Sequence, residues 1–436
     1  MARSASQSPD SDAATDGDAL PDHSRRRAMA TVVLVVFLDL VGFGIVIPIL
    51  PFYVRSFAVS DFYIGLLAAS YSIMQFVFAP LLGRLSDQHG RRPVLVLSLC
   101  GSVIAWTVFG LGGALWVLFL SRMLAGAMGG NISTAQAYVA DVTPPAERAK
   151  ALGILGAAFG LGFIFGPALG GVFASDAAVT TARDILPSFV PANRFSLPSF
   201  AAAGMSLLGV LVALKFLPEP DRLRTRGERQ TMVDQFRSAL ADPALRGLVI
   251  SFFLVSVAFS GVQVAFIPWL ADTFGYGESQ AALFLTYVGV LGVVVQGGLV
   301  GRVSKWLGDE RMAVTGGTAL ALALAVIPFA PDLGALLPAV GPLGPGVVGV
   351  VLVLPLLSFG NGLLNAALGA LVSKAASAER QGSAFGVTQG AGSLGRTVGP
   401  PAMAGLYAFA FHWVPFVVGG LLLVPVLGLL AALVRD

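Results

Sequence analysis

Residues 83–93 read GRLSDQHGRRP and lie between two apolar runs, at about 62–82 and 93–113. A shorter copy, GRVSKWLG, occupies residues 301–308 and also follows an apolar run, at about 277–298. Each apolar run has roughly the 20 residues that a helix needs to cross the hydrocarbon core of a bilayer. The repeated polar loop therefore predicts a membrane protein built from two related halves.

The composition of the chain agrees with a membrane protein. Of the 436 residues, 56% are hydrophobic and 12% are charged, against about 25% charged residues in a typical soluble domain. Mean hydropathy is +0.82. A soluble enzyme, a disordered protein or a disulfide-rich domain is a poor interpretation of these values. The single cysteine, the three scattered histidines and the lack of a GxxxxGK[ST] loop predict no metal site, no cofactor and no ATP site.

Apolar runs predict an all-α fold of twelve transmembrane helices. They lie at about 28–53, 62–82, 93–113, 115–139, 149–173 and 198–217, and again at 247–270, 277–298, 312–331, 344–371, 383–408 and 412–433. We expect a disordered cytoplasmic tail at 1–27, an N-terminal six-helix bundle at 28–217, a cytoplasmic linker at 218–246 and a C-terminal six-helix bundle at 247–436.

Further short matches recur in the same order in both halves. AER at 146–148 recurs at 378–380, GP at 166–167 recurs at 399–400, and IP at 47–48 recurs at 267–268. Two duplicated bundles are typical of secondary transporters, whose substrate site lies between the halves. The two bundles are therefore expected to be pseudo-symmetric.

The basic residues predict the orientation in the membrane. With the amino terminus inside, the cytoplasmic segments hold 22 of the 27 Lys and Arg, whereas the outside loops hold Arg55, Arg183 and Arg194. Cytoplasmic loops carry such an excess of positive charge. Both termini are expected in the cytoplasm, and the short loops suit a bacterial inner membrane. The net charge of +3 then reflects topology and does not indicate a nucleic-acid partner.

The motifs resemble those of a known family. The loop at 83–93 resembles the signature loop between helices 2 and 3 of the major facilitator superfamily, and Arg122 followed by Gly126 resembles the fourth-helix motif of its proton-driven members. Residues 38–51, which include Asp39, are similar to the first helix of the 12-helix drug:proton antiporters of the tetracycline-exporter type. The resemblance implies the major facilitator fold, a small-molecule substrate, protons as the coupling ion and a monomer in the lipid bilayer.

Two departures from the family pattern are visible. The tetracycline exporters carry acidic residues in the third and ninth helices, but the runs at 93–113 and 312–331 contain no Asp or Glu. Tetracycline is therefore a doubtful substrate. The second loop has Lys305 and Asp309 where the first has Asp87 and Arg91, so we expect that it cannot make the same contacts.

Asp39 and Arg122 are the predicted proton-coupling residues. Asp39 is the only acid well inside a predicted span, and it lies about 16 Å from the inner end of its helix. An apolar environment favours its neutral form, whereas a nearby cation favours the charged form. We expect Arg122 to pair with Asp39 and to release it when a substrate or proton arrives. The alternatives are a structural aspartate and a permanent ion pair between helices 1 and 4.

Arg396 is the other cation inside a predicted span. It either attracts an anionic substrate or bonds backbone carbonyls that Pro400 and Pro401 free from the helix ladder. We favour the structural role, because no acid in the same half is an obvious partner.

The loop at 83–93 is the predicted cytoplasmic gate, formed by Gly83, Asp87, Gly90, Arg91 and Arg92 together with Asp141. Arginines bond carboxylates in forked geometry, and the family resemblance supports Asp141 as the partner. Such contacts would hold an outward-open state. The alternative is that the arginines only set the topology.

Residues 162–171, GFIFGPALGG, resemble the fifth-helix motif associated with antiporters, with Gly162, Gly166, Pro167, Gly170 and Gly171 at the matching positions. Small residues at this spacing allow two helices to pack closely. The motif predicts either a seal against leakage or ordinary close packing.

The predicted substrate site combines amides with aromatic side chains. The amide candidates are Asn131, Gln136, Gln263, Asn361, Asn365 and Gln389, and the aromatic candidates are Phe43, Tyr138, Phe266 and Trp269. An apolar cavity with scattered amides suits a lipophilic compound that is cationic or neutral. We interpret the chain as a proton-coupled exporter of small hydrophobic or drug-like molecules that works by alternating access. The alternatives are a proton symporter for a small metabolite, a flippase for lipids or lipid-linked sugars, and a transporter-like protein that acts as a sensor or scaffold, against which the presence of both Asp39 and Arg122 argues.

Overall fold

The computed structural model describes residues 22–144, 147–220, 237, 240–376 and 381–435, and this part of the chain is helical with no β-strand. The predicted tail at 1–21 and most of the predicted linker, at 221–236 and 238–239, lie outside the described residues. The first helix begins at Asp22, so residues 22–27 belong to it and not to a disordered tail.

The first half contains nine helices among the described residues. They are α1 (Asp22–Val46), α2 (Leu50–Arg55), α3 (Phe62–His89), α4 (Arg91–Leu111), α5 (Leu115–Met128), α6 (Asn131–Val142), α7 (Arg148–Phe173), α8 (Asp176–Ile185) and α9 (Ser196–Phe216).

The second half repeats the pattern of long helices. Its elements are α11 (Pro243–Phe274), α12 (Glu278–Val294), the π-helix η2 (Val295–Leu299), α13 (Val300–Leu307), α14 (Asp309–Val326), the 3-10 helix η3 (Ile327–Phe329), α15 (Ala330–Gly334), α16 (Pro345–Ala375), α17 (Gln381–Phe409) and α18 (Val414–Arg435).

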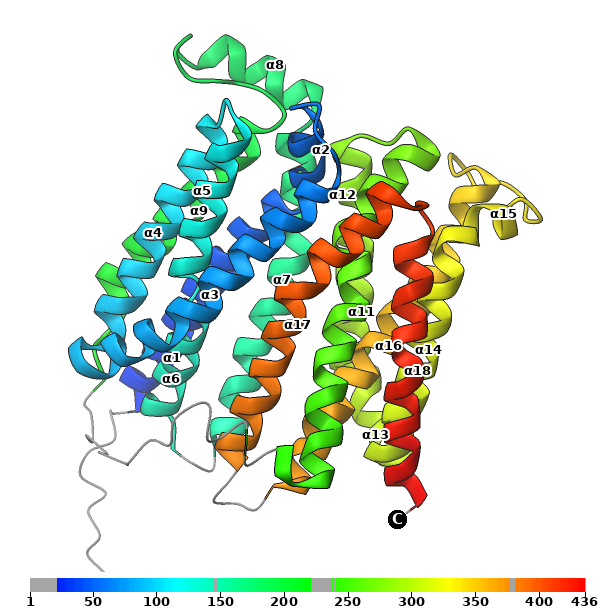
Figure 1. The fold of residues 1–436 in the computed structure, drawn as a ribbon. Coiled ribbons are helices and arrows are strands. Elements are labelled where there is room, and N and C mark those ends of the chain that lie inside the picture. Colours follow the sequence, from blue (N-terminus) through cyan, green and yellow to red (C-terminus); the bar gives the residue numbers. More distant parts are fainter. Residues whose placement is uncertain (1–21, 145–146, 221–236, 238–239, 377–380, 436) are drawn as a thin grey trace, which may run out of the picture.

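The two halves form pseudo-symmetric six-helix bundles, as predicted (Figure 1). Within the first bundle α1 packs on α7 and α9, and α4 packs on α9; within the second, α11 packs on α17 and α18, and α14 packs on α18. Between the bundles the second helix of each packs on the fifth helix of the other, as α3 on α17 and α12 on α7. The same pairs recur because the two halves repeat one packing scheme.

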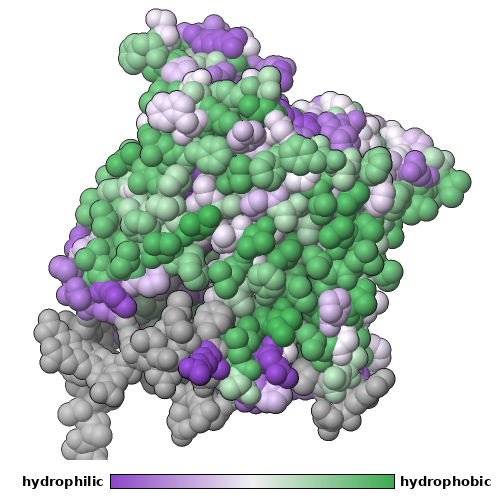
Figure 2. Space-filling view, in the orientation of Figure 1, coloured by the Kyte–Doolittle hydropathy of each residue, from purple (hydrophilic) through white to green (hydrophobic). Residues whose placement is uncertain are grey.

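The face of the molecule seen in Figure 2 carries a broad hydrophobic surface. Figure 2 shows apolar residues over the middle of the molecule and hydrophilic residues gathered toward its two ends. Eleven stretches within the described residues are long and apolar enough to cross a membrane, and α17, which carries Arg396, lies among them in the bundle as the twelfth. The twelve-helix multi-pass membrane fold is therefore confirmed.

Two of the predicted spans are broken. The first run ends as a helix at Val46 and resumes as the short α2, because Pro48 and Pro51 cannot donate to the helix ladder. The fourth run is divided at Gly129 and Gly130 into α5 and α6. Glycine weakens a helix interior, and the break at Gly129 and Gly130 makes Asn131 the first residue of α6.

The repeated loop has one structure in both copies. Gly90 follows α3 with φ of 122°, and Gly308 follows α13 with φ of 74°. Their amides donate to the carbonyls of Ser86 and Ser304 at 3.2 and 2.9 Å. Only glycine adopts such angles without strain, which explains why both copies carry glycine here.

The halves touch mainly at one end. We call the end that carries residues 83–93, α13 and the end of α18 the basic end, and the end that carries α2, α8 and α15 the opposite end (Figure 1). In the opposite-end half of the helices, a β-carbon on Gly65 would lie 2.6 Å from Cβ of Ala404, and one on Gly171 would lie 2.8 Å from Cβ of Ala282. Toward the basic end, a β-carbon on Gly156 of α7 would meet nothing within 4 Å. The described helices thus seal the opposite end and separate toward the basic end.

Candidate functional site

Asp39 lies on α1 beside three polar side chains from other helices of its bundle. Asn131 at the start of α6 donates its amide to Oδ2 of Asp39 at 2.5 Å. The Ser206 hydroxyl of α9 donates to Oδ1 at 3.5 Å, and the Ser102 hydroxyl is a further hydrogen-bond partner. The break between α5 and α6 brings Asn131 to this point. The carboxyl group is thus held by neutral hydrogen-bond donors.

Arg122 lies on α5 in a box of aromatic rings. Its guanidinium carbon is 4.6 Å from the ring centre of Tyr71, 5.6 Å from that of Phe43 and 5.7 Å from that of Trp106. The side chain is buried, and its Nε atom has no hydrogen-bond partner among the described residues. Cation–π attraction is therefore its main stabilisation in this state.

Asp39 and Arg122 do not form an ion pair within the described structure, although the sequence leads us to expect one. They share neighbours: Asp39, Phe43, Tyr71 and Trp106 all line a cavity of about 180 Å³, and the three aromatic residues are the walls of the Arg122 box. Asp39 therefore borders this small cavity, and Arg122 lies behind three of its aromatic walls without direct contact to Asp39.

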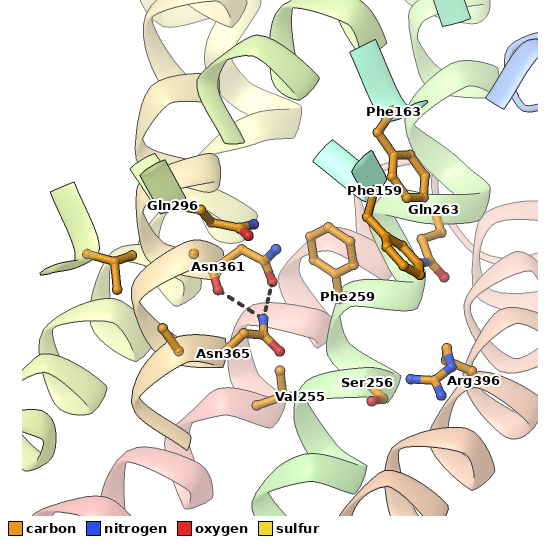
Figure 3. Close-up of a pocket in the computed structure, with 13 residues that line it drawn as sticks. Phe159, Phe163, Val255, Ser256, Phe259, Gln263, Gln296, Asn361, Asn365 and Arg396 are labelled. Atoms are coloured by element: carbon orange, nitrogen blue, oxygen red, sulfur yellow. Dashed lines mark hydrogen bonds between the residues drawn. The ribbon is translucent and has the colours of Figure 1, made fainter. Parts of the chain in front are cut away.

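A second, larger cavity of about 780 Å³ lies between the bundles. It is lined by Phe159, Phe163, Val255, Ser256, Phe259, Gln263, Gln296, Val300, Asn361, Gly362, Asn365, Ala366 and Arg396 (Figure 3). Phe159 and Phe163 of α7 also line the smaller cavity. These two rings separate the large space from the space beside Asp39.

Half of the predicted substrate amides line the large cavity. Gln263 lies on α11, and Asn361 and Asn365 lie one turn apart on α16. Asn365 donates its amide to the Asn361 side-chain oxygen at 2.8 Å. Asn131 lines the smaller cavity, where it already bonds Asp39.

The other two predicted amides, Gln136 and Gln389, are exposed and line neither cavity. Of the predicted aromatic residues, Phe43 lines the smaller cavity, while Phe266 and Trp269 belong to the buried core of the second bundle. Sequence analysis missed Gln296, which the π-helix η2 presents to the cavity. The Gly297-Gly298 pair beside it was the available signal.

Arg396 lines the large cavity near the middle of α17. Its guanidinium donates to the Ser393 hydroxyl at 2.8 Å, and Figure 3 shows it turned toward Ser256. The expected bonds to carbonyls freed by Pro400 and Pro401 are not among its hydrogen bonds within the described residues. The structural role that we favoured for Arg396 therefore lacks its predicted contacts.

The fifth-helix motif packs α7 against two helices. A β-carbon on Gly166 would lie 2.5 Å from the Cα of Gly44, and one on Gly162 would lie 2.7 Å from Cβ of Leu40. Gly170 approaches the Ile45 carbonyl in the same way. The next residue, Gly171, faces α12 of the other bundle. The glycines thus let α7 approach α1 closely, beside the helical turn that carries Asp39.

Arg91 forms the centre of the loop at the basic end. Its Nε atom lies 2.7 Å from Oδ2 of Asp141, the partner that the sequence predicts, and its Nη1 atom lies 2.7 Å from Oδ1 of Asp87. Glu219, which sequence analysis missed, accepts the backbone amides of Arg91 and Arg92 at 2.6 and 2.8 Å. A carboxylate at this helix start satisfies free amides and complements the helix dipole.

The second loop forms the corresponding ion pair with reversed signs. Asp309 begins α14 as Arg91 begins α4. Its partner Lys374 lies at the end of α16, with Nζ 2.8 Å from Oδ2 of Asp309. Our expectation that the second loop cannot make the same contacts is therefore wrong for the pair of Arg91 and Asp141, because reversing both charges preserves the attraction. The pair of Arg91 and Asp87 has no counterpart between Asp309 and Lys305 in the described part of the second loop.

A cluster of charged residues joins the bundles at the opposite end. Arg55 at the end of α2 contacts Asp61 at 2.7 Å and Asp272 of α11 at 2.8 Å, and Tyr407 of α17 donates to Asp272 at 2.6 Å. Burial alone lowers the pKa of Arg55, but the two carboxylates outweigh it and raise that pKa above its ordinary value. We call Arg55, Asp61, Asp272 and Tyr407 the opposite-end latch.

Comparison with known proteins gives consistent matches over nearly the whole chain. The family model for the Major Facilitator Superfamily matches residues 32–400. The chain is 29% identical to the class C tetracycline resistance protein of Escherichia coli over 87% of this chain and 90% of that protein. It is 27% identical to multidrug resistance protein 2 of Bacillus subtilis (strain 168) over 90% and 92% of the two chains.

A solved structure shares the arrangement of helices. The crystal structure of the human organic anion transporter MFSD10 (TETRAN) matches with a TM-score of 0.68 and 25% identity, over 94% of this chain and 100% of that chain. The matches cover both bundles and the space between them.

Proposed function

The chain belongs to the major facilitator superfamily and is a transporter rather than an enzyme, and from that premise we propose that it exports small hydrophobic or drug-like molecules in exchange for protons. The named relatives include tetracycline and multidrug resistance proteins and an organic anion transporter. They support transport of drug-like molecules without fixing the charge of the substrate.

The observation that carries the proposal is the environment of Asp39. A carboxyl group inside a membrane bundle is costly when charged, by about 2.5–3.5 kcal/mol on insertion scales. Here it is held by the neutral donors of Asn131 and Ser206, which hydrogen-bond its oxygens without neutralising a charge. Such a group changes its protonation state readily when access to water or to Arg122 changes. We assign the proton of the transport cycle to Asp39.

Arg122 can stabilise the ionised form of Asp39 in a second state of the transporter. In the described state its charge is satisfied by the rings of Phe43, Tyr71 and Trp106. Movement of Arg122 toward Asp39 would favour the ionised carboxyl and expel its proton. Because Phe159 and Phe163 border both cavities, a substrate in the large cavity contacts rings that also face Asp39. Substrate and proton are thereby coupled through side chains of one bundle.

The arrangement of the halves supports alternating access. We place the basic end and both termini in the cytoplasm of a bacterial inner membrane, following the distribution of Lys and Arg. The opposite-end latch then holds the outer side closed, and the described structure corresponds to an inward-facing state of a monomer. In the outward-open state, the loop of Arg91 and Asp87 would contact the second bundle at the cytoplasmic side.

The latch gives a prediction about this equilibrium. Asp272→Asn should increase the outward-open population several-fold, because a network of partly exposed ion pairs contributes about 1 kcal/mol. The opening would be measured as the distance between two spin labels by double electron–electron resonance. The labels are attached to cysteines introduced by Tyr63→Cys and Phe411→Cys in a Cys100→Ser background. Asp332→Asn, which changes an exposed acid at the same end, is the matched control. An unchanged distance distribution in Asp272→Asn would show that the opposite-end latch does not control the opening of this end.

The direction of transport is tested in everted membrane vesicles acidified by ATP-driven proton pumping. Uptake of tetracycline, rhodamine 6G and fluorescein should be followed with and without a protonophore. An exporter of this type accumulates at least one of these probes, and the protonophore abolishes the accumulation. Each charge moved adds about 2.3 kcal/mol per 100 mV to the driving force.

Two other outcomes identify the alternative functions. Release of a preloaded probe from the acidified vesicles indicates a proton symporter that imports its substrate. Absence of probe accumulation, together with transfer of labelled lipid between the leaflets of proteoliposomes, indicates a flippase. Either outcome contradicts the proposed export.

A further inference from the structure

Among the described residues that line the large cavity, Arg396 is the only charged one. It is half-buried near the middle of α17, roughly 22 Å along the helix from its first residue. Its hydrogen bond goes to the neutral hydroxyl of Ser393, and no described carboxylate lies within ion-pair distance of it. A cation thus faces an open space between the bundles with only neutral partners.

The acidic residue that is nearest to the transport path does not neutralise this cation. Asp39 lines the smaller cavity and is held there by Asn131. Arg122, the other intramembrane cation, is enclosed by aromatic rings of the first bundle, Tyr71 among them. Among the described residues, the lining of the large cavity thus carries a positive charge and no carboxyl group.

A half-buried cation inside the membrane still requires an opposite charge or several hydrogen-bond acceptors, and intramembrane charges are rare unless they serve transport. The guanidinium donates in a planar fork that fits carboxylate and sulfonate groups. The remaining donors of Arg396 are directed into a space large enough for a drug-sized molecule. Substrate can supply the missing negative charge.

The other walls of the cavity suit an aromatic body. Phe159 and Phe163 of α7 and Phe259 of α11 present their rings on one side, and Asn361 and Asn365 present amides on another (Figure 3). Aromatic rings bind a flat apolar body, while the amides bind neutral oxygen or nitrogen substituents. Among the described lining residues, only Arg396 offers a positive charge to an anionic group.

We propose that the transported substrate is an aromatic organic anion, with its carboxylate, sulfonate or phenolate group bound by Arg396. This differs from the cationic or neutral class that the amide pattern suggests in the sequence, and it gives Arg396 the substrate role that sequence analysis placed second. As a statement about transport it rests on the proposed function, but binding of the anion does not require proton coupling.

Two dyes with the same three-ring core and opposite charge test the proposal. Binding of fluorescein, an anion, and rhodamine 6G, a cation, is measured by equilibrium dialysis of the purified chain, with empty detergent micelles as the blank. The wild-type protein should bind fluorescein about tenfold more tightly, the difference that charged hydrogen bonds typically supply. Arg396→Gln should weaken fluorescein binding about tenfold and leave rhodamine 6G binding unchanged or stronger.

Two further variants make the result specific. Arg396→Lys keeps the positive charge but loses the planar, two-donor geometry of the guanidinium group, so it should retain part of the fluorescein affinity. Arg311→Gln removes an exposed arginine of the same bundle and should bind both dyes as the wild type does. Rhodamine 6G binding by Arg396→Gln also shows that the variant is folded. Absence of saturable fluorescein binding to the wild type, equal or tighter binding of rhodamine 6G, or unchanged fluorescein binding by Arg396→Gln would overturn the proposal.

The two proposals fail in different ways. Proton-driven accumulation of rhodamine 6G without fluorescein binding would overturn the anionic substrate class and leave the exporter function standing. Fluorescein binding that depends on Arg396, without any proton-driven transport, would overturn the proton-coupled function and leave the anion site standing.

Discussion

Asp39→Asn is expected to abolish proton-driven export while leaving the substrate site intact. Asparagine has nearly the same shape and can keep the contact with Asn131, but it cannot take up or release a proton. A potential of 100 mV is worth about 2.3 kcal/mol per charge, or about a 50-fold concentration ratio. The variant should accumulate no substrate above equilibrium in acidified everted vesicles, while the wild type does.

Substrate exchange provides the control for this variant. Exchange of labelled for unlabelled substrate across proteoliposomes needs no net proton movement, so Asp39→Asn should still exchange. Asp332→Asn, a change at an exposed position, should show both activities. Normal energised accumulation by Asp39→Asn would mean that the proton is carried elsewhere, and loss of exchange together with accumulation would mean that Asp39 serves the structure or the substrate.

The fold was predictable because its signals are local. Runs of about 20 apolar residues mark spans in any polytopic protein, and the duplicated loop marks the two halves. The position of Asp39 inside a membrane span was equally predictable, and an acid there is rare enough to make it a candidate functional residue. The breaks before α2 and α6 were not predicted, although Pro48 and the pair Gly129-Gly130 supply their physical cause.

The lining of the site was harder to predict because it depends on how each helix is rotated. Gln136 and Gln389 have the same chemistry as Gln263, yet only Gln263 faces the large cavity. Contacts between distant segments were also hidden. The Glu219 carboxylate accepts the backbone amide of Arg91 in the first turn of α4, although the two residues are 128 positions apart in the sequence. Lys374 of α16 forms the ion pair with Asp309 of the second loop.

Substituting two glycines of α7 is the second change with a large expected effect. Gly166 is needed for the folded bundle, whereas Gly156 is needed only if the basic end closes during transport. Gly166 lies where the backbones of α7 and α1 touch, and a β-carbon there would be 2.5 Å from the Cα of Gly44. Gly166→Leu should therefore prevent the first bundle from packing, by several kcal/mol of overpacking. The expected result is little or no monodisperse protein after extraction from the membrane.

Gly156→Leu is the matched change ten residues earlier on the same helix, where a β-carbon meets nothing within 4 Å. This variant should fold, elute and bind substrate as the wild type does, because the described state has room for the leucine. If the basic end closes during transport, α7 must approach the second bundle there, and the added side chain should then reduce export about tenfold or more. Measuring elution, dye binding and vesicle uptake for both variants separates packing from motion. Full export by a folded Gly156→Leu protein would contradict closure at this part of α7, whereas normal folding of Gly166→Leu would contradict the close approach of α7 to α1.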